Sequence, residues 1–174
     1  MPELPDVEVM RRYFQSTALH QEIETIELRA EILVEDKGDS DPVKKALVGS
    51  SFESTLRHGK WLFTALNDAS NKSLVLHFGM TGGLKYYKHG EDEPEYTLAL
   101  FCFTNGYQLA YFSMCKLGDL EVIGSVANFI KEKDLGPDAL EITMADFKKA
   151  VEGRGMMAKS LLMGQETLAG IGNV

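Results

Sequence analysis

The second residue of the chain is a proline, and this position gives it chemistry that an internal residue lacks. The chain opens with Met1-Pro2-Glu3-Leu4-Pro5-Asp6-Val7-Glu8. Aminopeptidases readily remove methionine before a residue this small, which would leave the Pro2 nitrogen as a free secondary amine. An α-amino group has a pKa of about 7.7 to 8.0, so a useful fraction is unprotonated and nucleophilic at neutral pH. Such an amine can attack a carbonyl carbon and form an iminium ion, a recognised route of covalent catalysis.

Glu3 provides a second reactive group, because it places a carboxyl group beside this nitrogen for proton transfer. Pro5 opens a helical pattern that we expect to run to about His20, with one apolar face formed by Val7, Met10, Phe14 and Ala18. The positive N-terminal end of that helix would favour the neutral amine over the ammonium. The plainer interpretation is that Met1-Pro2 is an ordinary start. The chemistry also requires that Met1 is removed, because otherwise the nitrogen is an amide.

Two turn segments carry candidate phosphate ligands. Lys60, in Arg57-His58-Gly59-Lys60-Trp61, lies between a glycine turn and an apolar strand, where it could be a fixed cation or an ordinary hairpin lysine. Gly170-Ile171-Gly172-Asn173 could point backbone N–H groups at a phosphate, with Asn173 adding a side-chain donor. A tight turn would also explain these glycines. Lys159, one expected helix earlier, could face the same groove.

A third segment, His77-Phe78-Gly79-Met80-Thr81-Gly82-Gly83-Leu84, joins an apolar strand to a glycine-bracketed methionine. A flexible, unbranched side chain such as Met80 is suited to entering a base stack and filling the gap left by an extruded nucleotide. The alternatives are that Met80 folds back onto the core and that His77 is a buried, hydrogen-bonded histidine.

The composition limits the classes of function. A net charge of −8 argues against a general binder of polyanions, although a local basic stripe can lie on an acidic body. With 174 residues, 44% of them apolar, the chain can form one domain, or one domain and an incomplete second. We find no membrane span and no signal peptide, and therefore expect a cytoplasmic protein. Cys102 and Cys115 alone cannot make a four-cysteine zinc site and are expected to be free thiols.

The pattern of apolar runs and turns predicts a β-sandwich behind the first helix, and hence a mainly β fold of the α+β class. Strands are expected at residues 22–34, 51–57, 60–66, 73–78, 95–104, 107–112 and 119–123, with a short helix at 41–48. Asn105-Gly106 is the strongest hairpin turn. From about Ser125 the pattern becomes helical: residues 134–138 form a linker, Thr143 with Asp146 indicates a capping box, and residues 156–163 suggest another helix.

Taken in order, these segments resemble the formamidopyrimidine-DNA glycosylase and endonuclease VIII family of bifunctional base-excision repair enzymes. The motifs that carry the resemblance occupy residues 2–8, 59–62, 77–82, 135–137 and 170–173. The resemblance implies a catalytic β-sandwich domain over residues 1–124. It also implies that residues 125–174 form the first part of a helix–two-turn–helix DNA-binding module.

The resemblance further implies that Pro2 attacks C1′ of a damaged nucleoside and displaces the base, while Glu3 moves protons to the ring oxygen. Lyase steps would then cut the strand. The resemblance also places Asp6 and Lys60 in the catalytic group, with Lys60, His77 and Asn173 at phosphate-binding positions. The other implied DNA-binding residues are Met80 as a wedge, Lys159 near the lesion, and Lys116 and Leu117. The expected substrate is double-stranded DNA with oxidised purines or abasic sites, bound by a monomer without a cofactor.

Three departures from the family pattern change these expectations. Asp6 stands where the family usually has glutamate. Lys116 and Leu117 lie where the formamidopyrimidine branch has an arginine and an aromatic wedge, which puts selectivity for the opposite base in doubt. The family continues past Asn173 into further helices and a zinc or zinc-less finger. We therefore expect a fragment or a short form with weak affinity for duplex DNA.

Two other functions fit part of the same residues. A non-catalytic DNA-binding relative would show salt-dependent binding without strand cleavage. An N-terminal proline can also act as a general base, as in tautomerases that act on keto acids. That second scheme leaves Lys60, Met80 and residues 170–173 without a role.

Overall fold

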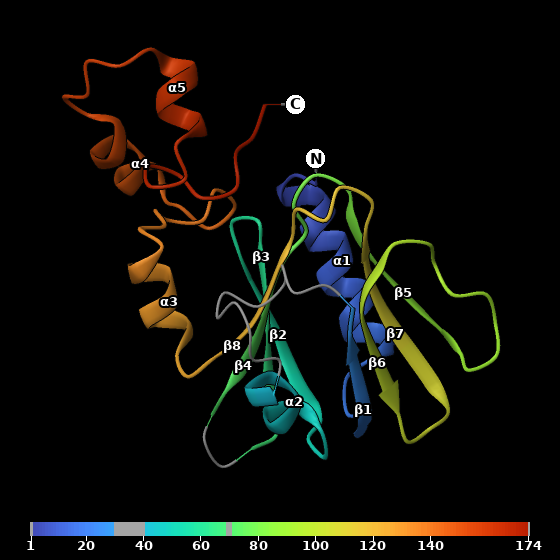
Figure 1. The fold of residues 1–174 in the computed structure, drawn as a ribbon. Coiled ribbons are helices and arrows are strands. Elements are labelled where there is room, and N and C mark those ends of the chain that lie inside the picture. Colours follow the sequence, from blue (N-terminus) through green and yellow to red (C-terminus); the bar gives the residue numbers. More distant parts are fainter. Residues whose placement is uncertain (1, 30–40, 69–70, 174) are drawn as a thin grey trace.

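The computed structural model describes residues 2–29, 41–68 and 71–173, which form two four-stranded antiparallel sheets and several helices (Figure 1). The first sheet has the order β1-β6-β7-β5 and contains β1 (Ile23–Leu28), β5 (Gly82–Lys88), β6 (Thr97–Phe103) and β7 (Tyr107–Ser113). The second has the order β2-β3-β4-β8 and contains β2 (Phe52–His58), β3 (Trp61–Leu66), β4 (Ser73–His77) and β8 (Asp119–Ile123). The helices are α1 (Leu4–Thr17), α2 (Asp41–Leu47), α3 (Val126–Glu132), α4 (Met144–Val151) and α5 (Ala158–Met163). The expected α+β sandwich with an N-terminal helix is confirmed.

The first helix, α1, buries the apolar face that its periodicity predicts. Val7, Phe14 and Ala18 are fully buried, and the helix packs against β2 and β5. At its beginning the N–H of Glu3 donates to Asp6 Oδ2 at 2.8 Å, so that Asp6 closes the first turn. Figure 1 places the beginning of α1 and the last segment of the chain at the same end of the sandwich.

The core between the sheets is centred on aromatic rings. Phe52 makes edge-to-face contacts with Phe14 at 5.0 Å and with Phe101 at 5.8 Å between ring centroids. On the outer face of the second sheet, Phe129 of α3 packs against Phe63 and Trp61. This helix explains why β3 is apolar on both faces, because both faces are covered.

Strand β5 is absent from the strands that the sequence predicts. Its two glycines and its lysines conceal the alternation of apolar residues that marks a strand. The glycines are required by packing, because a Cβ at Gly83 would lie 2.6 Å from Phe112 Cζ. The expected continuation of the first strand over residues 30–34 lies outside the described residues, and β1 ends at Leu28.

The helical segment after β8 begins as expected. Ser125 caps α3 and Thr143 caps α4, the latter by accepting a hydrogen bond from the N–H of Asp146 at 3.1 Å. Residues 134–138, predicted to be a linker, lie in the connection between α3 and α4 and pack closely. The N–H of Gly136 donates to the carbonyl of Gln165, and Asp138 pairs with Ala169 in a parallel bridge. None of the helices in the described residues has the length and apolar character needed to cross a bilayer.

Candidate active site

The Glu3 carboxylate and the Lys60 ammonium meet where α1 begins beside the β2–β3 turn. Lys60 Nζ lies 2.7 Å from Glu3 Oε2, and the two side chains are only 10% and 13% exposed. Burial of a charged group is costly unless a partner compensates it, which each of these residues does for the other. Pro2 is half-buried and directly precedes Glu3 in the chain. The nucleophile proposed from the sequence is therefore followed by a carboxylate that pairs with a cation, whereas Met1 lies outside the described residues.

The segment of residues 170–173 covers this pair. A Cβ added at Gly172 would overlap Glu3 Oε2, and one added at Gly170 would overlap the side chain of Leu4. Gly170 also has a φ of +112°, which L side chains rarely adopt. Both glycines are thus required by close approach to the start of the chain. Asn173, at the end of this segment, is exposed.

A buried ion pair between Arg57 and Asp138 fixes the β2–β3 turn to the helical segment. Arg57 donates to Asp138 Oδ1 at 2.8 Å and to the Gly59 carbonyl at 2.8 Å, while the Gly59 N–H donates to Asp138 Oδ2 at 2.7 Å. Burial opposes ionisation of Asp138, but the hydrogen bonds from Arg57, Gly59 and Leu140 outweigh it and hold its pKa below the usual range. The turn that carries Lys60 is therefore rigidly placed.

Sequence reasoning missed both members of this pair. Arg57 was visible at the end of a strand and Asp138 directly after Gly136-Pro137. They are 81 positions apart in the chain, and nothing in the sequence indicates that they meet. Only the path of the chain brings them together.

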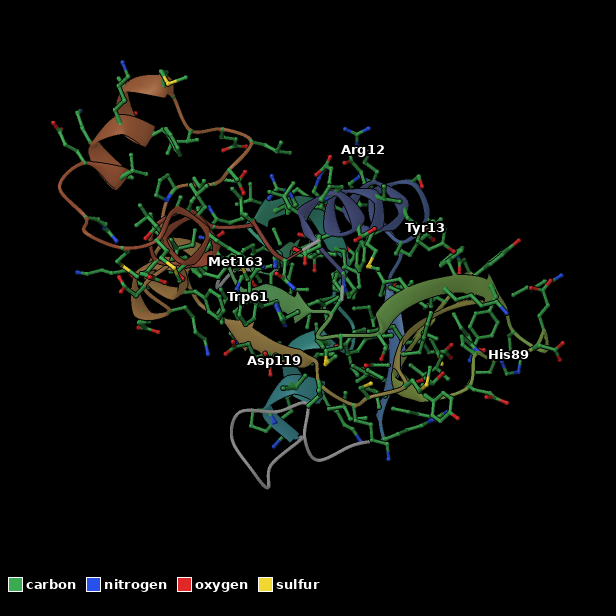
Figure 2. The ribbon with its side chains drawn as sticks, turned by 90° about the horizontal axis from the view of Figure 1, so that it is seen from above. Arg12, Tyr13, Trp61, His89, Asp119 and Met163 are labelled. Carbon is green, nitrogen blue, oxygen red and sulfur yellow. The ribbon has the colours of Figure 1, made fainter. Side chains whose placement is uncertain are left out.

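His77 lies beside Trp61 at the end of β4, with ring centroids 4.6 Å apart. Burial lowers the pKa of His77; the Asp119 carboxylate, 4.0 Å away, opposes this shift, and the Lys60 charge adds to it. The N–H of Gly79 donates to His77 Nδ1 at 3.3 Å, so the neutral ring carries its proton on Nε2. His77 can therefore offer an N–H donor at neutral pH. Figure 2 shows Trp61 and Asp119 on the part of the sandwich that faces the helical segment, far from His89.

The loops of Met80 and Leu117 lie against each other. Thr81 Oγ1 accepts from the Cys115 N–H at 3.0 Å, and a Cβ added at Gly79 would overlap the Leu117 carbonyl. Met80 is 52% exposed and Leu117 56% exposed, so Met80 does not fold back onto the core. The pair forms an exposed apolar tip, with Lys116 exposed next to it.

The remaining candidates lie farther from the Glu3–Lys60 pair or act on it indirectly. Asp6 is exposed, and its contact with the Glu3 N–H is that of a helix cap. Lys159 is exposed on α5, and in the described part of the chain no hydrogen bond or ion pair joins it to Glu3 or Lys60. The cysteines Cys102 and Cys115 are free thiols, as expected. Residues 2–29, 41–68 and 71–173 contain no group of three His, Cys, Asp or Glu residues placed to hold a metal ion.

Comparison with known proteins supports the family resemblance of the sequence. A model of the formamidopyrimidine-DNA glycosylase N-terminal domain matches residues 1–120. The formamidopyrimidine-DNA glycosylase of Bacillus subtilis is 31% identical over 180 residues, and that of Lactobacillus delbrueckii is 30% identical. Each alignment covers all of this chain but only 63% of the relative. The chain thus spans less than two thirds of the length of these curated relatives.

Solved structures agree with the sequence matches. The Lactococcus lactis enzyme in complex with DNA that contains N7-benzyl-Fapy-dG superposes with a TM-score of 0.88 at 26% identity, covering 99% of this chain and 64% of that one. The same enzyme bound non-covalently to DNA with an abasic site gives a TM-score of 0.87 at 25% identity, covering 99% and 66%.

Proposed function

Because the chain belongs to the formamidopyrimidine-DNA glycosylase family, we propose that it removes oxidised bases from double-stranded DNA and cuts the strand at the abasic site. The observation that carries this proposal is the buried Glu3–Lys60 pair, which adjoins Pro2 and lies under the segment of residues 170–173. The activity is the one that the names of the relatives state, and the proposal extends it to this chain. The chain spans 63% of the length of the Bacillus subtilis relative.

The first chemical step would use the free secondary amine of Pro2, after removal of Met1. As the bond from the Pro2 nitrogen to C1′ forms, the glycosidic bond breaks and its electron pair leaves with the base, which takes up a proton. Loss of the amine proton and opening of the sugar ring give an iminium ion at C1′, and the electron pair of the C1′–O4′ bond goes to O4′. Glu3, a carboxylate in the structure, would accept the amine proton and then deliver it to O4′ as general acid.

Strand cleavage would follow from the same iminium ion. Its positive charge acidifies the C2′ protons, so that loss of one expels the 3′ phosphate by elimination. Water then hydrolyses the iminium ion and frees Pro2. The amine and the carboxyl group suffice for this sequence, so the proposal includes no metal and no cofactor.

The surrounding residues would hold the DNA. His77, Asn173 and the cations Lys116 and Lys159 would contact phosphates, through N–H donors and charge. The tip formed by Met80 and Leu117 would enter the base stack and fill the space left by the extruded nucleotide. Such a protein would work as a monomer in the cytoplasm, where it reaches the genome.

The test is reductive trapping. Protein whose N-terminal mass shows that Met1 is absent is incubated with a duplex containing 8-oxoguanine and with borohydride. A covalent adduct is expected, and Pro2→Gly, which leaves a primary amine, should weaken it strongly. Pro5→Ala, which leaves the terminal amine intact, is the control. Salt-dependent binding without any adduct would instead identify a DNA-binding protein without this chemistry.

A further inference from the structure

The side chain of Gln165 makes hydrogen bonds to three backbone groups of the segment that follows α5. Its Nε2 donates to the carbonyl of Met163 at 3.0 Å and to that of Ile171 at 2.8 Å, and its Oε1 accepts from the N–H of Gly170 at 2.9 Å. A primary amide has two N–H donors, and both are used here. Gln165 therefore ties the end of α5 to the middle of the segment of residues 170–173.

Gln165 is itself held firmly. Its backbone carbonyl accepts from the N–H of Gly136 at 2.8 Å, and a Cβ at Gly136 would lie 2.8 Å from the carbonyl oxygen of Glu166. The neighbouring Asp138 is the buried partner of Arg57. The anchor thus belongs to the same rigid junction that places the Lys60 turn.

The tied segment needs such an anchor because two of its residues are glycines. Glycine has the greatest backbone freedom and provides no side chain to hold it in place. Among the hydrogen bonds of the described residues, those of the Gly170 N–H and the Ile171 carbonyl go to the Gln165 side chain. Removal of these bonds would release the two positions together.

Greater freedom of residues 170–172 would directly affect the position of the Glu3 carboxylate. Gly172, one residue beyond Ile171, approaches the Glu3 carboxylate so closely that a Cβ would overlap its Oε2. This contact limits the positions that the carboxylate can take and keeps water from that side. We propose that Gln165 is a positioning residue, whose amide fixes residues 170–172 so that Glu3 is aligned for proton transfer. The catalytic part of this inference rests on the proposed function.

Two variants of similar size separate the effect of the amide hydrogen bonds from the effect of side-chain size. Gln165→Met keeps the length and removes the hydrogen bonds, whereas Gln165→Glu keeps an acceptor and removes both donors. Gln165→Asn retains the amide one methylene further back and should give an intermediate effect. The control is Gln21→Ala, since Gln21 bonds Asn105 in the β6–β7 turn, away from this site.

The measurements are the single-turnover rate of strand cleavage at an abasic site, the Kd for the same duplex, the melting temperature, and amide hydrogen exchange of the free protein. We expect the Met and Glu variants to cleave about 10- to 100-fold more slowly, as small misplacements of reacting groups do, while the Kd changes by less than about 3-fold. Exchange at Gly170 should accelerate at least about 10-fold, without a change at Gly59. A role limited to stability would lower the melting temperature and leave cleavage unchanged well below it.

Amide hydrogen exchange separates failure of the proposed function from failure of the positioning role of Gln165. If the parent protein forms no adduct, the proposed function fails, and exchange at Gly170 still decides whether Gln165 fixes the segment. If the parent forms an adduct and both variants cleave and exchange as it does, the positioning role of Gln165 is overturned while the proposed function stands.

Discussion

Arg57 and Asp138 form a buried ion pair between the β2–β3 turn and the helical segment, and this pair holds the two parts of the candidate site together. The two side chains are only 5% and 2% exposed. The same Asp138 carboxylate also accepts from the Gly59 N–H next to Lys60. A change at either residue should therefore alter stability and the position of the Lys60 turn at once.

We predict that Asp138→Ala destabilises the protein by about 3–5 kcal/mol, because it leaves the Arg57 charge buried without a partner. Urea unfolding of this variant, of Arg57→Ala and of the double variant gives the coupling of the pair, which should exceed about 1 kcal/mol. Asp146→Ala, which removes the exposed Asp146–Lys149 pair and the hydrogen bond from Thr143, is the control, and its unfolding midpoint should stay much closer to that of the parent. Strictly additive effects of the two buried changes would contradict the prediction.

Stability should also fall in acid through Glu8. Hydrogen bonds from Arg11 lower the pKa of Glu8 to about 2 against an opposing effect of burial, and those from Arg12 add to the shift. Because the folded pKa lies below the unfolded value, the unfolded state binds more protons in acid. The contribution is therefore complete above the ordinary glutamate pKa of 4.5 and is lost as the pH falls towards about 2. Glu8→Gln should make the unfolding free energy depend less on pH between 4.5 and about 2. An unchanged dependence would refute the assignment of this acid effect to Glu8.

His77 should titrate below an ordinary histidine. Its burial beside Trp61 disfavours the imidazolium and lowers the pKa of His77, so its NMR titration midpoint should lie below the usual histidine value of about 6.5. Since the unfolded state binds the proton more readily, this site should cost stability as the pH falls below the usual histidine value of about 6.5. Asp119→Asn should lower the midpoint further, because it removes the charge that opposes the shift. A midpoint above about 6.5 would show that the Asp119 charge dominates over burial instead.

The sequence predicts well what depends on local periodicity and poorly what depends on the path of the chain. The buried face of α1, with Val7 and Phe14, follows from helical spacing. The sequence does not predict strand β5, because its glycines and lysines mask the alternation of apolar residues that marks a strand. The pairing of Lys60 with Glu3 was not anticipated either, since the sequence indicates a cation available to phosphate. Whether two distant side chains meet is decided by tertiary packing, which no local pattern records.

A side chain at Gly172 should displace the Glu3 carboxylate. Gly172→Ala places a methyl group against Glu3 Oε2, so the carboxylate or the segment must move. We expect adduct formation in the trapping assay to fall by about 100-fold, the scale associated with a misplacement of roughly 1 Å. Gly124→Ala is the matched control, because an added Cβ there meets nothing within 4 Å. Equal trapping by the two variants would show that the approach of Gly172 to Glu3 has no catalytic consequence.

The exposed tip of Met80 and Leu117 should matter for DNA and not for folding. Both side chains are more than half exposed, so Met80→Ala and Leu117→Ala should change unfolding free energy by less than about 0.5 kcal/mol. If the tip fills the space of an extruded nucleotide, each truncation should weaken binding to a lesion duplex by about 1.5–3 kcal/mol, the range for burying an apolar side chain of this size. Binding to undamaged duplex should change less, because no nucleotide is extruded there. Met144→Ala, on the exposed surface of α4, controls for loss of an apolar side chain.

The loops that carry Met80 and Leu117 are joined through Thr81 and Cys115, so the double variant should lose less binding free energy than the sum of the single losses. Equal losses on damaged and undamaged DNA would assign the tip to general contact rather than to lesion capture.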